Sequence, residues 1–267
     1  MDDSTRGAAF FDLDRTLIAG SSVFTFATVA WRNKVITTRD LFKDATNAIA
    51  FRLAGASDGK SEAVRDRILS AVEGLNQADL LGFNEEIIPR VLERVRPEAR
   101  GLVDMHHEAG RDCFIISASP EELVEPLSRA LGMQGGIGTR SEVADGVYTG
   151  RLAGPFCYGE GKAEIIQRIA EARGYDLRLC YGYSDSASDL PMLELVGHAV
   201  AVNPDGALQS VARQRGWPVV TFARRRKAAV MSTTASVGAA ALGVGSYALG
   251  RRHGRIVTEA TRGRRRR

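Results

Sequence analysis

Residues 8–16 of the chain read AAFFDLDRT, and this stretch decides the fold class. It begins as a short apolar run, Ala8–Leu13, that ends in acids, as is typical of a buried strand in a parallel sheet. Proteins that alternate strands and helices place their sites at the carboxyl ends of such strands. We therefore expect the carboxylates of Asp12 and Asp14 to lie at the mouth of an α/β sheet.

The composition indicates an ordinary folded protein. Of 267 residues, 44% are hydrophobic and 25% are charged, which excludes a disordered or collagen-like chain. This length typically makes one domain, or one domain with an insertion. The N-terminus lacks the pattern of a secretory signal, so we expect a cytoplasmic catalytic domain. An odd number of cysteines without metal-ligand or redox spacing predicts free thiols; they are Cys113, Cys157 and Cys180.

The order of patterns along the chain predicts an α/β core that is split by a helical insertion. Residues 21–95 read as helices, whereas strands and helices alternate after Pro97, which favours a parallel sheet. We expect a Rossmann-like core at 1–18 and 97–223 and a helical cap at 19–96. The expected cap helices are Ser22–Trp31, Asp40–Leu53, Ser61–Leu75 and Gln77–Val95. The later strands are expected at Asp112–Ser117, Leu177–Gly182 and Ala199–Val202, and a helix at Lys162–Arg173.

Two segments are expected near the mouth of the sheet. An insertion that follows the first strand directly would overhang the carboxyl ends of the strands. The segment Ile137–Leu152 alternates apolar and polar residues around Asp145-Gly146, which is a turn signal. We therefore expect a β-hairpin at 137–152 that lies over the site.

The pair Asp12 and Asp14 suits nucleophilic hydrolysis. One carboxylate can attack phosphorus, while the other protonates the leaving oxygen and then activates water. An acidic strand end or an unrelated cation site would show the same pattern, so the pair alone leaves these alternatives open.

A second acidic cluster, YSDSASD at residues 183–189, follows another apolar run. Carboxylates among small residues supply the hard oxygen ligands that Mg²⁺ prefers, with water and substrate phosphate completing the octahedron. The alternative is a helix start at which Ser188 or Asp189 serves as the N-cap.

Two further residues suit a phosphate site. Ser117 ends an apolar run and precedes Pro120, so its hydroxyl lies at a strand-to-helix junction, which is a ready anion site. A plain N-cap serine is the alternative. Lys162 opens a helix, where a cation opposes the helix dipole; this indicates that Lys162 faces an anion, with an exposed lysine as the alternative.

Together, in this order, these elements resemble the haloacid dehalogenase-like (HAD) superfamily, subfamily IB. They are most similar to its phosphoserine-phosphatase-like branch, which carries a helical cap after the first motif. The resemblance covers roughly residues 8–222. Residues 12–16 (DLDRT) resemble the first motif, Ser117 the second, Lys162 the third, and Asp185 with Asp189 the fourth.

The resemblance implies a Mg²⁺-dependent phosphatase that hydrolyses a small phosphomonoester through an aspartyl-phosphate. Asp12 would be the nucleophile, and Asp14 the general acid and then the base. Thr16, Ser117 and Lys162 would bind the substrate phosphate.

The resemblance also implies a metal site. Mg²⁺ would be held by an oxygen of Asp12, the main-chain carbonyl of Asp14 and the carboxylate of Asp185. Asp189 would support either the metal shell or the lysine of the third motif. Arg15 either contacts the substrate or points to solvent.

The substrate and the outcome of the reaction stay open. Members of the branch use a Glu shortly after the first motif to hold the amino group of phosphoserine, but residues 17–26 (LIAGSSVFTF) contain no acid. This argues against phosphoserine. A phosphotransferase, and a noncatalytic HAD-fold module that binds membrane or nucleic acid through its tail, are the alternative functions.

The C-terminal segment 224–267 is basic at both ends and uncharged in the middle. Residues 228–250 are long enough to cross a bilayer as a helix, although small and polar residues dominate them. A membrane anchor, a helix on anionic membrane lipid and a disordered basic tail are the three interpretations, and we favour membrane association. Nucleic acid is not expected as a partner, because the arginines lack aromatic neighbours for base stacking. Nothing in the sequence identifies a protein partner.

Overall fold

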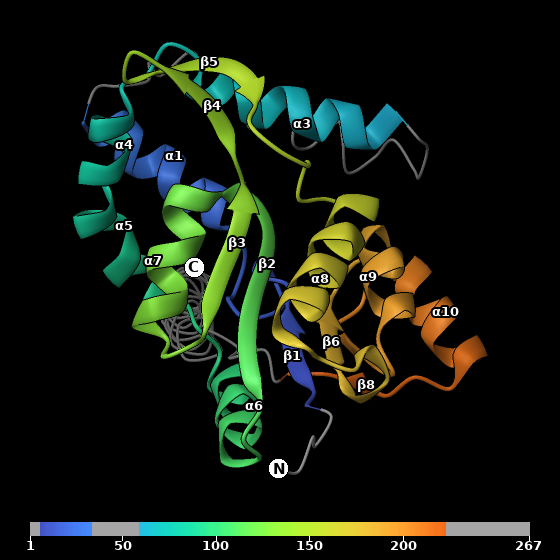
Figure 1. Ribbon diagram of the computed structural model, residues 1–267. Coiled ribbons are helices and arrows are strands. Elements are labelled where there is room, and N and C mark those ends of the chain that lie inside the picture. Colours follow the sequence, from blue (N-terminus) through green and yellow to red (C-terminus); the bar gives the residue numbers. More distant parts are fainter. Residues whose placement is uncertain (1–5, 34–58, 223–267) are drawn as a thin grey trace, which may run out of the picture. The chain divides into compact units, whose positions relative to one another are not determined.

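The computed structural model describes residues 6–33 and 59–222, and its main feature confirms the expected α/β class (Figure 1). Six strands form one sheet in which every neighbouring pair is parallel. Across the sheet the strands are β3 (Gly135–Thr139), β2 (Asp112–Pro120), β1 (Ala8–Phe11), β6 (Tyr181–Ser184), β7 (His198–Val202) and β8 (Val219–Val220).

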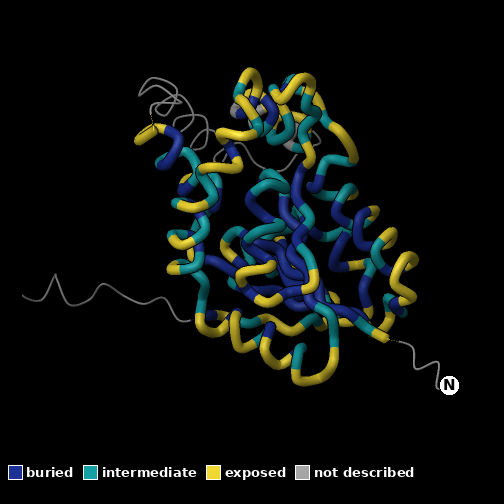
Figure 2. Tube along the Cα trace, turned by 60° about the vertical axis from the view of Figure 1, so that its left-hand side comes forward, coloured by how far each residue is buried: buried dark blue, intermediate teal, exposed yellow. Residues whose placement is uncertain are grey.

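Helices cover both faces of this sheet, and strand β1 shows why. Its successive side chains point to opposite faces, and all of them are buried. Ala9 and Phe11 pack into one core cluster, and Ala8 and Phe10 into another, so the buried strands lie between two helical layers (Figure 2). The first cluster contains residues of α6 (Pro97–Glu108) and α7 (Glu121–Ala130), and the second contains residues of α8 (Glu160–Arg173), α9 (Leu190–Leu195) and α10 (Gly206–Arg215).

The insertion after β1 leaves the core and returns to it at one place. Ile18 and Val95 form an antiparallel bridge, and the N–H of Ala19 donates to the carbonyl of Arg94 at 2.8 Å. The described helices between these points are α1 (Ser22–Arg32), α3 (Gly59–Val72), α4 (Gln77–Gly82) and α5 (Asn84–Leu92).

Of the helices expected in the cap, one is divided in the structure and one remains untested. The single helix expected at 77–95 is two helices, which divide at Phe83 between Gly82 and Asn84, residues that both weaken a helix. The helix expected at 40–53 lies outside the described residues.

The expected hairpin is shorter than 137–152. Ile137 belongs to β3 and pairs with Ile116 of β2, so the hairpin comprises only β4 (Ser141–Ala144) and β5 (Val147–Leu152). It also joins the cap, because the N–H of Tyr148 donates to the carbonyl of Leu75 at 3.0 Å. Residues 75–77 were expected to lie within a purely helical segment, but their backbone is hydrogen-bonded to the hairpin.

The strand expected at Leu177–Gly182 is only partly correct. Leu177–Leu179 forms a short 3₁₀ helix, η1, because the side chain of Asp176 accepts the N–H of Arg178 at 2.9 Å and turns the chain. Strand β6 begins at Tyr181. The expected strands at 112–117 and 199–202 are confirmed, and β2 continues to Pro120.

No helix in the described ranges 6–33 and 59–222 has both the length and the apolar character that crossing a bilayer requires. The segment 224–267, with the candidate membrane helix at 228–250, lies outside the described residues. Membrane association and an anionic lipid partner therefore stay predictions.

A buried polar pair links α6 to the sheet. His106 is fully buried, its Nε2 lies 2.8 Å from the hydroxyl of Tyr183, and its Nδ1 lies 3.4 Å from Nη1 of Arg111. A guanidinium can only donate, so Nδ1 accepts and the proton lies on Nε2. Burial, together with the charges of Arg111 and His107, lowers the pKa of His106 to about 4.

We expect His106 to make the fold less stable in mild acid. The unfolded chain takes up a proton on this side chain below about pH 6.5, whereas the folded protein resists protonation until about pH 4. The free energy of unfolding should therefore fall as the pH is lowered through this interval. Urea unfolding of the wild type and of His106→Gln, at about pH 7.5 and about pH 4.5, measures this contribution. Between these two pH values, the free energy of unfolding should fall by on the order of 2 kcal/mol more in the wild type than in the variant. An equal fall in both proteins would contradict a lowered pKa for His106.

Candidate active site

The residues predicted from the sequence meet at the carboxyl ends of three neighbouring strands. Asp12 directly follows β1, Ser117 lies in the last part of β2, and Asp185 directly follows β6. Strand β1 lies between β2 and β6 in the sheet. Asp189 comes from the short helix η2 (Ala187–Asp189), and Lys162 from the first turn of α8.

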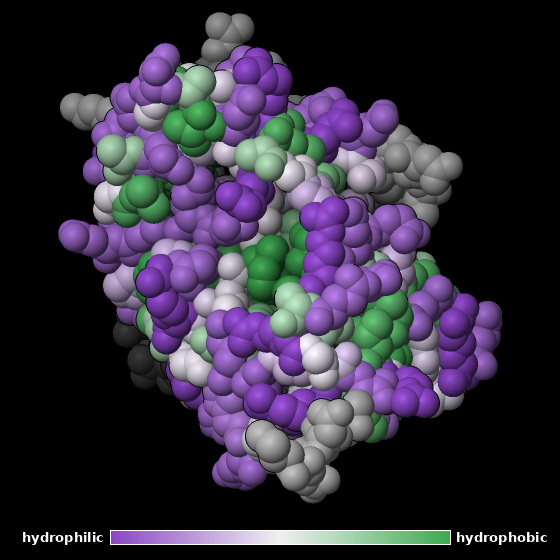
Figure 3. Space-filling model, in the orientation of Figure 1, coloured by the Kyte–Doolittle hydropathy of each residue, from purple (hydrophilic) through white to green (hydrophobic). Residues whose placement is uncertain are grey.

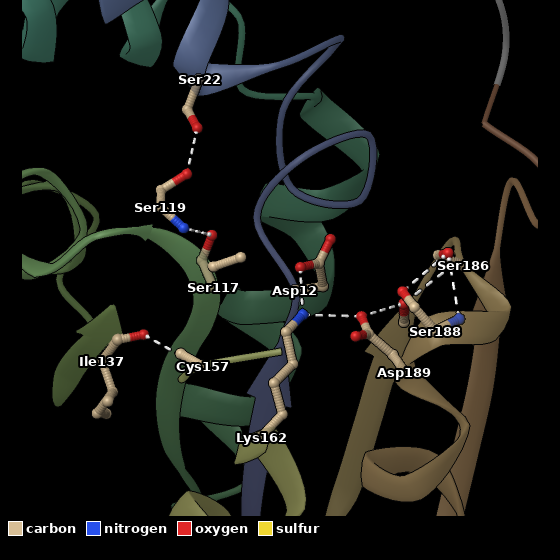
Figure 4. Close-up of polar contacts among 12 residues, drawn as sticks. Asp12, Ser22, Ser117, Ser119, Ile137, Cys157, Lys162, Ser186, Ser188 and Asp189 are labelled. Atoms are coloured by element: carbon tan, nitrogen blue, oxygen red, sulfur yellow. Dashed lines mark hydrogen bonds and ion pairs between the residues drawn. The ribbon is translucent and has the colours of Figure 1, made fainter. Parts of the chain in front are cut away.

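Lys162 is the buried centre of this group. Its Nζ lies 2.7 Å from Oδ1 of Asp12 and 2.8 Å from Oδ2 of Asp189 (Figure 4), and only 3% of the residue is exposed. The hydroxyl of Ser184 donates to the same Asp189 oxygen at 2.7 Å. Burial acts to lower the pKa of Lys162, but the carboxylates of Asp12 and Asp189 outweigh it and raise that pKa. The lysine is thus held as a cation, and the alternative of an exposed side chain is wrong.

Two glycines allow Lys162 to take this place. Gly159 has φ 53°, a conformation that favours glycine, at the residue before α8. At Gly161, a Cβ atom would lie 1.9 Å from the carbonyl oxygen of Phe156. Only glycine therefore lets the first turn of α8 approach the preceding loop and direct Lys162 toward the strand ends.

The first turn of α1 fixes the side chain of Asp14. The N–H of Ser22 donates to Oδ1 of Asp14 at 2.6 Å. Ser22 is the first residue of α1, so the carboxylate also lies at the positive end of the helix dipole. Burial raises the pKa of Asp14, although the hydrogen bonds from Ser22 oppose the shift.

Three serines connect the same helix turn to β2. The hydroxyls of Ser22 and Ser119 lie 2.7 Å apart, and the N–H of Ser119 donates to Oγ of Ser117 at 3.2 Å (Figure 4). All three residues are buried. The residue that precedes α7 is Pro120, so the alternative that Ser117 is a plain N-cap is wrong.

Asp189 is also not a helix cap in the ordinary sense. It occupies the position before α9, but its side chain makes no capping hydrogen bond and pairs with Lys162 and Ser184 instead. Ser186 caps η2 by accepting the N–H of Ser188. Asp205 holds this loop, because its N–H donates to the carbonyl of Asp185 at 2.8 Å.

Asp185 has an oxygen without a hydrogen bond. The residue is only 4% exposed, and its Oδ2 accepts no hydrogen bond. Nε of Arg15 lies 3.0 Å from that oxygen, but the two groups are not aligned as donor and acceptor. Arg15 has φ 66° and a half-exposed side chain. Burial raises the pKa of Asp185 to about 7, with Arg15 opposing and Asp189 adding to the shift.

The site holds more negative than positive charge. Burial raises the pKa of Asp12 to about 8; Lys162 opposes this shift, and the carboxylates of Asp189 and Asp185 add to it. The main cause of both shifts is the loss of water around these carboxylates, so their ionised forms would gain from further positive charge. A divalent cation next to Asp12 and Asp185 would supply that charge.

These residues fit Mg²⁺. The Oδ2 of Asp185, which accepts no hydrogen bond, and the carboxylate of Asp12 are hard oxygen ligands, and Mg²⁺ commonly takes one or two carboxylates while keeping several waters. In the described part of the chain, no group of three or more His, Cys, Asp or Glu residues is arranged to hold a metal ion, but Mg²⁺ is commonly bound by only one or two carboxylates. The identity of the ligands stays a proposal.

Some residues of the site were missed by sequence reasoning, and one predicted residue has no partner. Oγ1 of Thr16 is buried without a hydrogen bond, as expected for a group that a ligand would satisfy. Ser22, Ser119 and Ser184 were not predicted. Ser184 directly precedes Asp185, which is the one local signal; the other two become neighbours only through the fold.

A separate hollow contains none of these residues. It has a volume of about 370 Å³ and lies between β3, α7 and α8, with Phe114, Ile137 and Ile169 among its lining residues. On this face of the molecule, hydrophilic side chains surround a few exposed apolar ones (Figure 3). Glu125, Arg168 and Arg173 also line this hollow, but none of the motif residues does, so the strand ends are the candidate active site.

Comparison with known proteins agrees with this site. Residues 9–194 match the family of haloacid dehalogenase-like hydrolases. A probable phosphatase of Mycobacterium tuberculosis is 42% identical over 259 residues, covering 92% of this chain and 90% of the relative. A phosphoserine phosphatase of the same species is 38% identical over 247 residues, covering 92% and 80%.

A solved structure is similar over the same part of the chain. A protein of unknown function from Bordetella pertussis Tohama I has a TM-score of 0.70 at 29% identity, covering 81% of this chain and 99% of that one. The family match spans β1 to α9 and therefore includes all four motifs. The chain belongs to the haloacid dehalogenase-like hydrolase family, as a phosphatase-type member.

Proposed function

We propose that the protein is a Mg²⁺-dependent phosphatase that hydrolyses a small phosphomonoester through an aspartyl-phosphate on Asp12. The observation that carries this proposal is the buried contact of Lys162 with both Asp12 and Asp189. One oxygen of Asp12 is held by the lysine, and the other points away from it (Figure 4). A carboxylate held in this way is oriented for attack, and Lys162 lies where negative charge would accumulate.

In the first step, an Asp12 oxygen forms a bond to phosphorus while the bond between phosphorus and the leaving oxygen breaks. Asp14, in its protonated form, gives its proton to the leaving oxygen. Lys162 offsets negative charge, which is the main contribution a protein makes to phosphoryl transfer. Ser117 accepts the N–H of Ser119, so its own O–H is free to donate to a phosphate oxygen.

In the second step, water replaces the aspartate. Asp14, now a carboxylate, takes a proton from a water molecule as the water oxygen attacks phosphorus. The bond between phosphorus and Asp12 breaks, which frees inorganic phosphate and restores both side chains. The hydrogen bond from the N–H of Ser22 holds Asp14 in place for both proton transfers.

The metal would complete the charge balance. Bound Mg²⁺ supplies positive charge that polarises the phosphoryl oxygens. Asp12, Asp185 and the main-chain carbonyl of Asp14 are the groups that would hold it, and Asp189 supports the site by fixing Lys162.

The substrate class is a small phosphomonoester. One relative is named a phosphoserine phosphatase, but residues 17–26 of this chain provide no carboxylate for an amino group. We therefore propose that phosphoserine is not the preferred substrate, and a substrate panel should include it beside other alkyl and aryl phosphates.

We expect Asp12→Asn to abolish phosphate release. The amide keeps the shape of the side chain but cannot act as the nucleophile, so kcat/KM should fall by about a thousandfold or more. Colorimetric phosphate release by the full-length chain, with Mg²⁺ and the substrate panel, measures the loss. Mass spectrometry after acid quench should detect a phosphate adduct on the wild type and none on the variant.

Asp145→Asn is a matched control, since it makes the same change on an exposed turn of the hairpin. It should retain wild-type activity. If Asp12→Asn keeps more than about a tenth of the wild-type rate while folded, the covalent mechanism is wrong.

We expect a chelator to remove the activity and added Mg²⁺ to restore it. Asp185→Asn removes the negative charge of a side chain whose Oδ2 has no hydrogen bond, so it should raise the Mg²⁺ concentration needed for half-maximal activity by about tenfold or more. Mg²⁺ should also raise the melting temperature of the wild type, and less so that of the variant. An Asp185→Asn protein with the Mg²⁺ dependence of Asp145→Asn would refute the assignment of this ligand.

A further inference from the structure

Ser22 contacts two parts of the site that are otherwise separate. Its N–H donates to Asp14 at 2.6 Å, and its hydroxyl lies 2.7 Å from that of Ser119. Ser22 belongs to the first turn of the cap helix α1, whereas Asp14 follows β1 and Ser119 lies in β2. A single residue of the cap therefore touches both the proposed acid and the strand that carries Ser117.

The contact with Ser119 affects how Ser117 can act. Because the N–H of Ser119 donates to Oγ of Ser117, one lone pair of that oxygen is used and the hydroxyl proton is directed elsewhere. The position of the Ser119 backbone thus decides where the Ser117 proton points. The side chain of Ser119 is in turn held by the hydroxyl of Ser22 (Figure 4).

The two hydroxyl groups of Ser22 and Ser119 are buried, so removing one of them costs stability. Ser22 is 0% and Ser119 is 2% exposed, so neither hydroxyl is open to water. The Ser22 hydroxyl also acts on Asp14, whose pKa it helps to lower, whereas the Ser119 hydroxyl contacts Ser22. An unpaired buried hydroxyl is costly, whereas removing both partners can be nearly neutral. The pair therefore fixes the first turn of α1 relative to the end of β2.

We propose that Ser22 and Ser119 are positioning residues, whose hydroxyl pair couples the cap helix to proton transfer by Asp14 and to phosphate binding by Ser117. This inference rests on the proposed function. When the pair is intact, the N–H of Ser22 holds the acid at the leaving oxygen. When it is broken, the first turn of α1 shifts and both groups lose their alignment.

The choice of leaving group in the substrate distinguishes an effect on proton transfer by Asp14 from an effect on phosphate binding by Ser117. Phenyl phosphate releases a phenoxide with a conjugate acid of pKa about 10, as for tyrosine, so its departure benefits from a proton. The more acidic leaving group of p-nitrophenyl phosphate needs less help from an acid. Loss of alignment at Asp14 should therefore harm the first substrate more than the second.

The test compares kcat/KM of full-length Ser22→Ala, Ser119→Ala and the double variant with both substrates, because kcat/KM reports the steps up to formation of the aspartyl-phosphate. We expect each single variant to lose about tenfold with phenyl phosphate and about threefold with p-nitrophenyl phosphate. The double variant should lose no more than Ser22→Ala, since both lack the same contact with Ser119.

Stability distinguishes positioning from general damage. Ser22→Ala leaves the buried Ser119 hydroxyl without its partner and should unfold at a lower urea concentration, whereas the double variant should regain part of that stability. Activity with phenyl phosphate should stay low in the double variant. The proposal is overturned if the double variant regains activity together with stability. It is also overturned if kcat/KM falls by the same factor with both substrates.

Ser128→Ala is the matched control. Ser128 is fully buried in α7, and its hydroxyl donates to the carbonyl of Glu125 at 2.7 Å, away from the site. It should lower stability without changing the ratio of the two substrates. A wild type that releases no phosphate from any substrate would instead refute the proposed function, and variants that match Ser128→Ala in an active enzyme would refute only the coupling.

Discussion

The buried ammonium of Lys162 is the constraint on which the arrangement of the site depends. It lies in the first turn of α8, where the helix dipole disfavours a cation, and it contacts carboxylates carried by β1 and by η2. Leaving any one of these charges buried without the others would cost several kcal/mol. The packing of α8 beside the strand ends is therefore tied to the geometry of Asp12, and the stability of the fold and the orientation of the nucleophile have one cause.

The cap depends on the core in a comparable way. The chain leaves after Ile18 and returns at Val95, where the two segments form a bridge, so the start of α1 lies close to the first motif. The N–H of Ser22 can then reach Asp14 without a long loop between them. A helix that begins at this point contributes its free N–H groups and the positive end of its dipole to an acid. The insertion therefore does more than cover the strand ends.

Local patterns predicted much of this fold, and contacts between distant residues explain what they missed. The apolar run before Asp12 and the alternation of strands and helices after Pro97 predicted the parallel sheet, because both can be recognised from neighbouring residues along the chain. Leu177–Leu179 has the composition of a strand, but the side chain of Asp176 turns it into a 3₁₀ helix. Ile137 joins the sheet through its pairing with β2, which no hairpin pattern reveals. The contact between Ser22 and Ser119 joins residues that carry no periodic signal, so only the fold could show it.

The charges of the site affect how a phosphorylated substrate would bind. Asp12, Asp185 and Asp189 are buried together with a single buried lysine, and the half-exposed Arg15 lies at the edge. A phosphate monoester brings further negative charge, so these carboxylates would repel the substrate if they acted alone. Burial raises the pKa values of Asp12 and Asp185, and neighbouring carboxylates add to both shifts. In the proposed mechanism, the cation that relieves the repulsion also keeps Asp12 ionised and able to attack, so substrate binding and nucleophile activation would depend on the same ion.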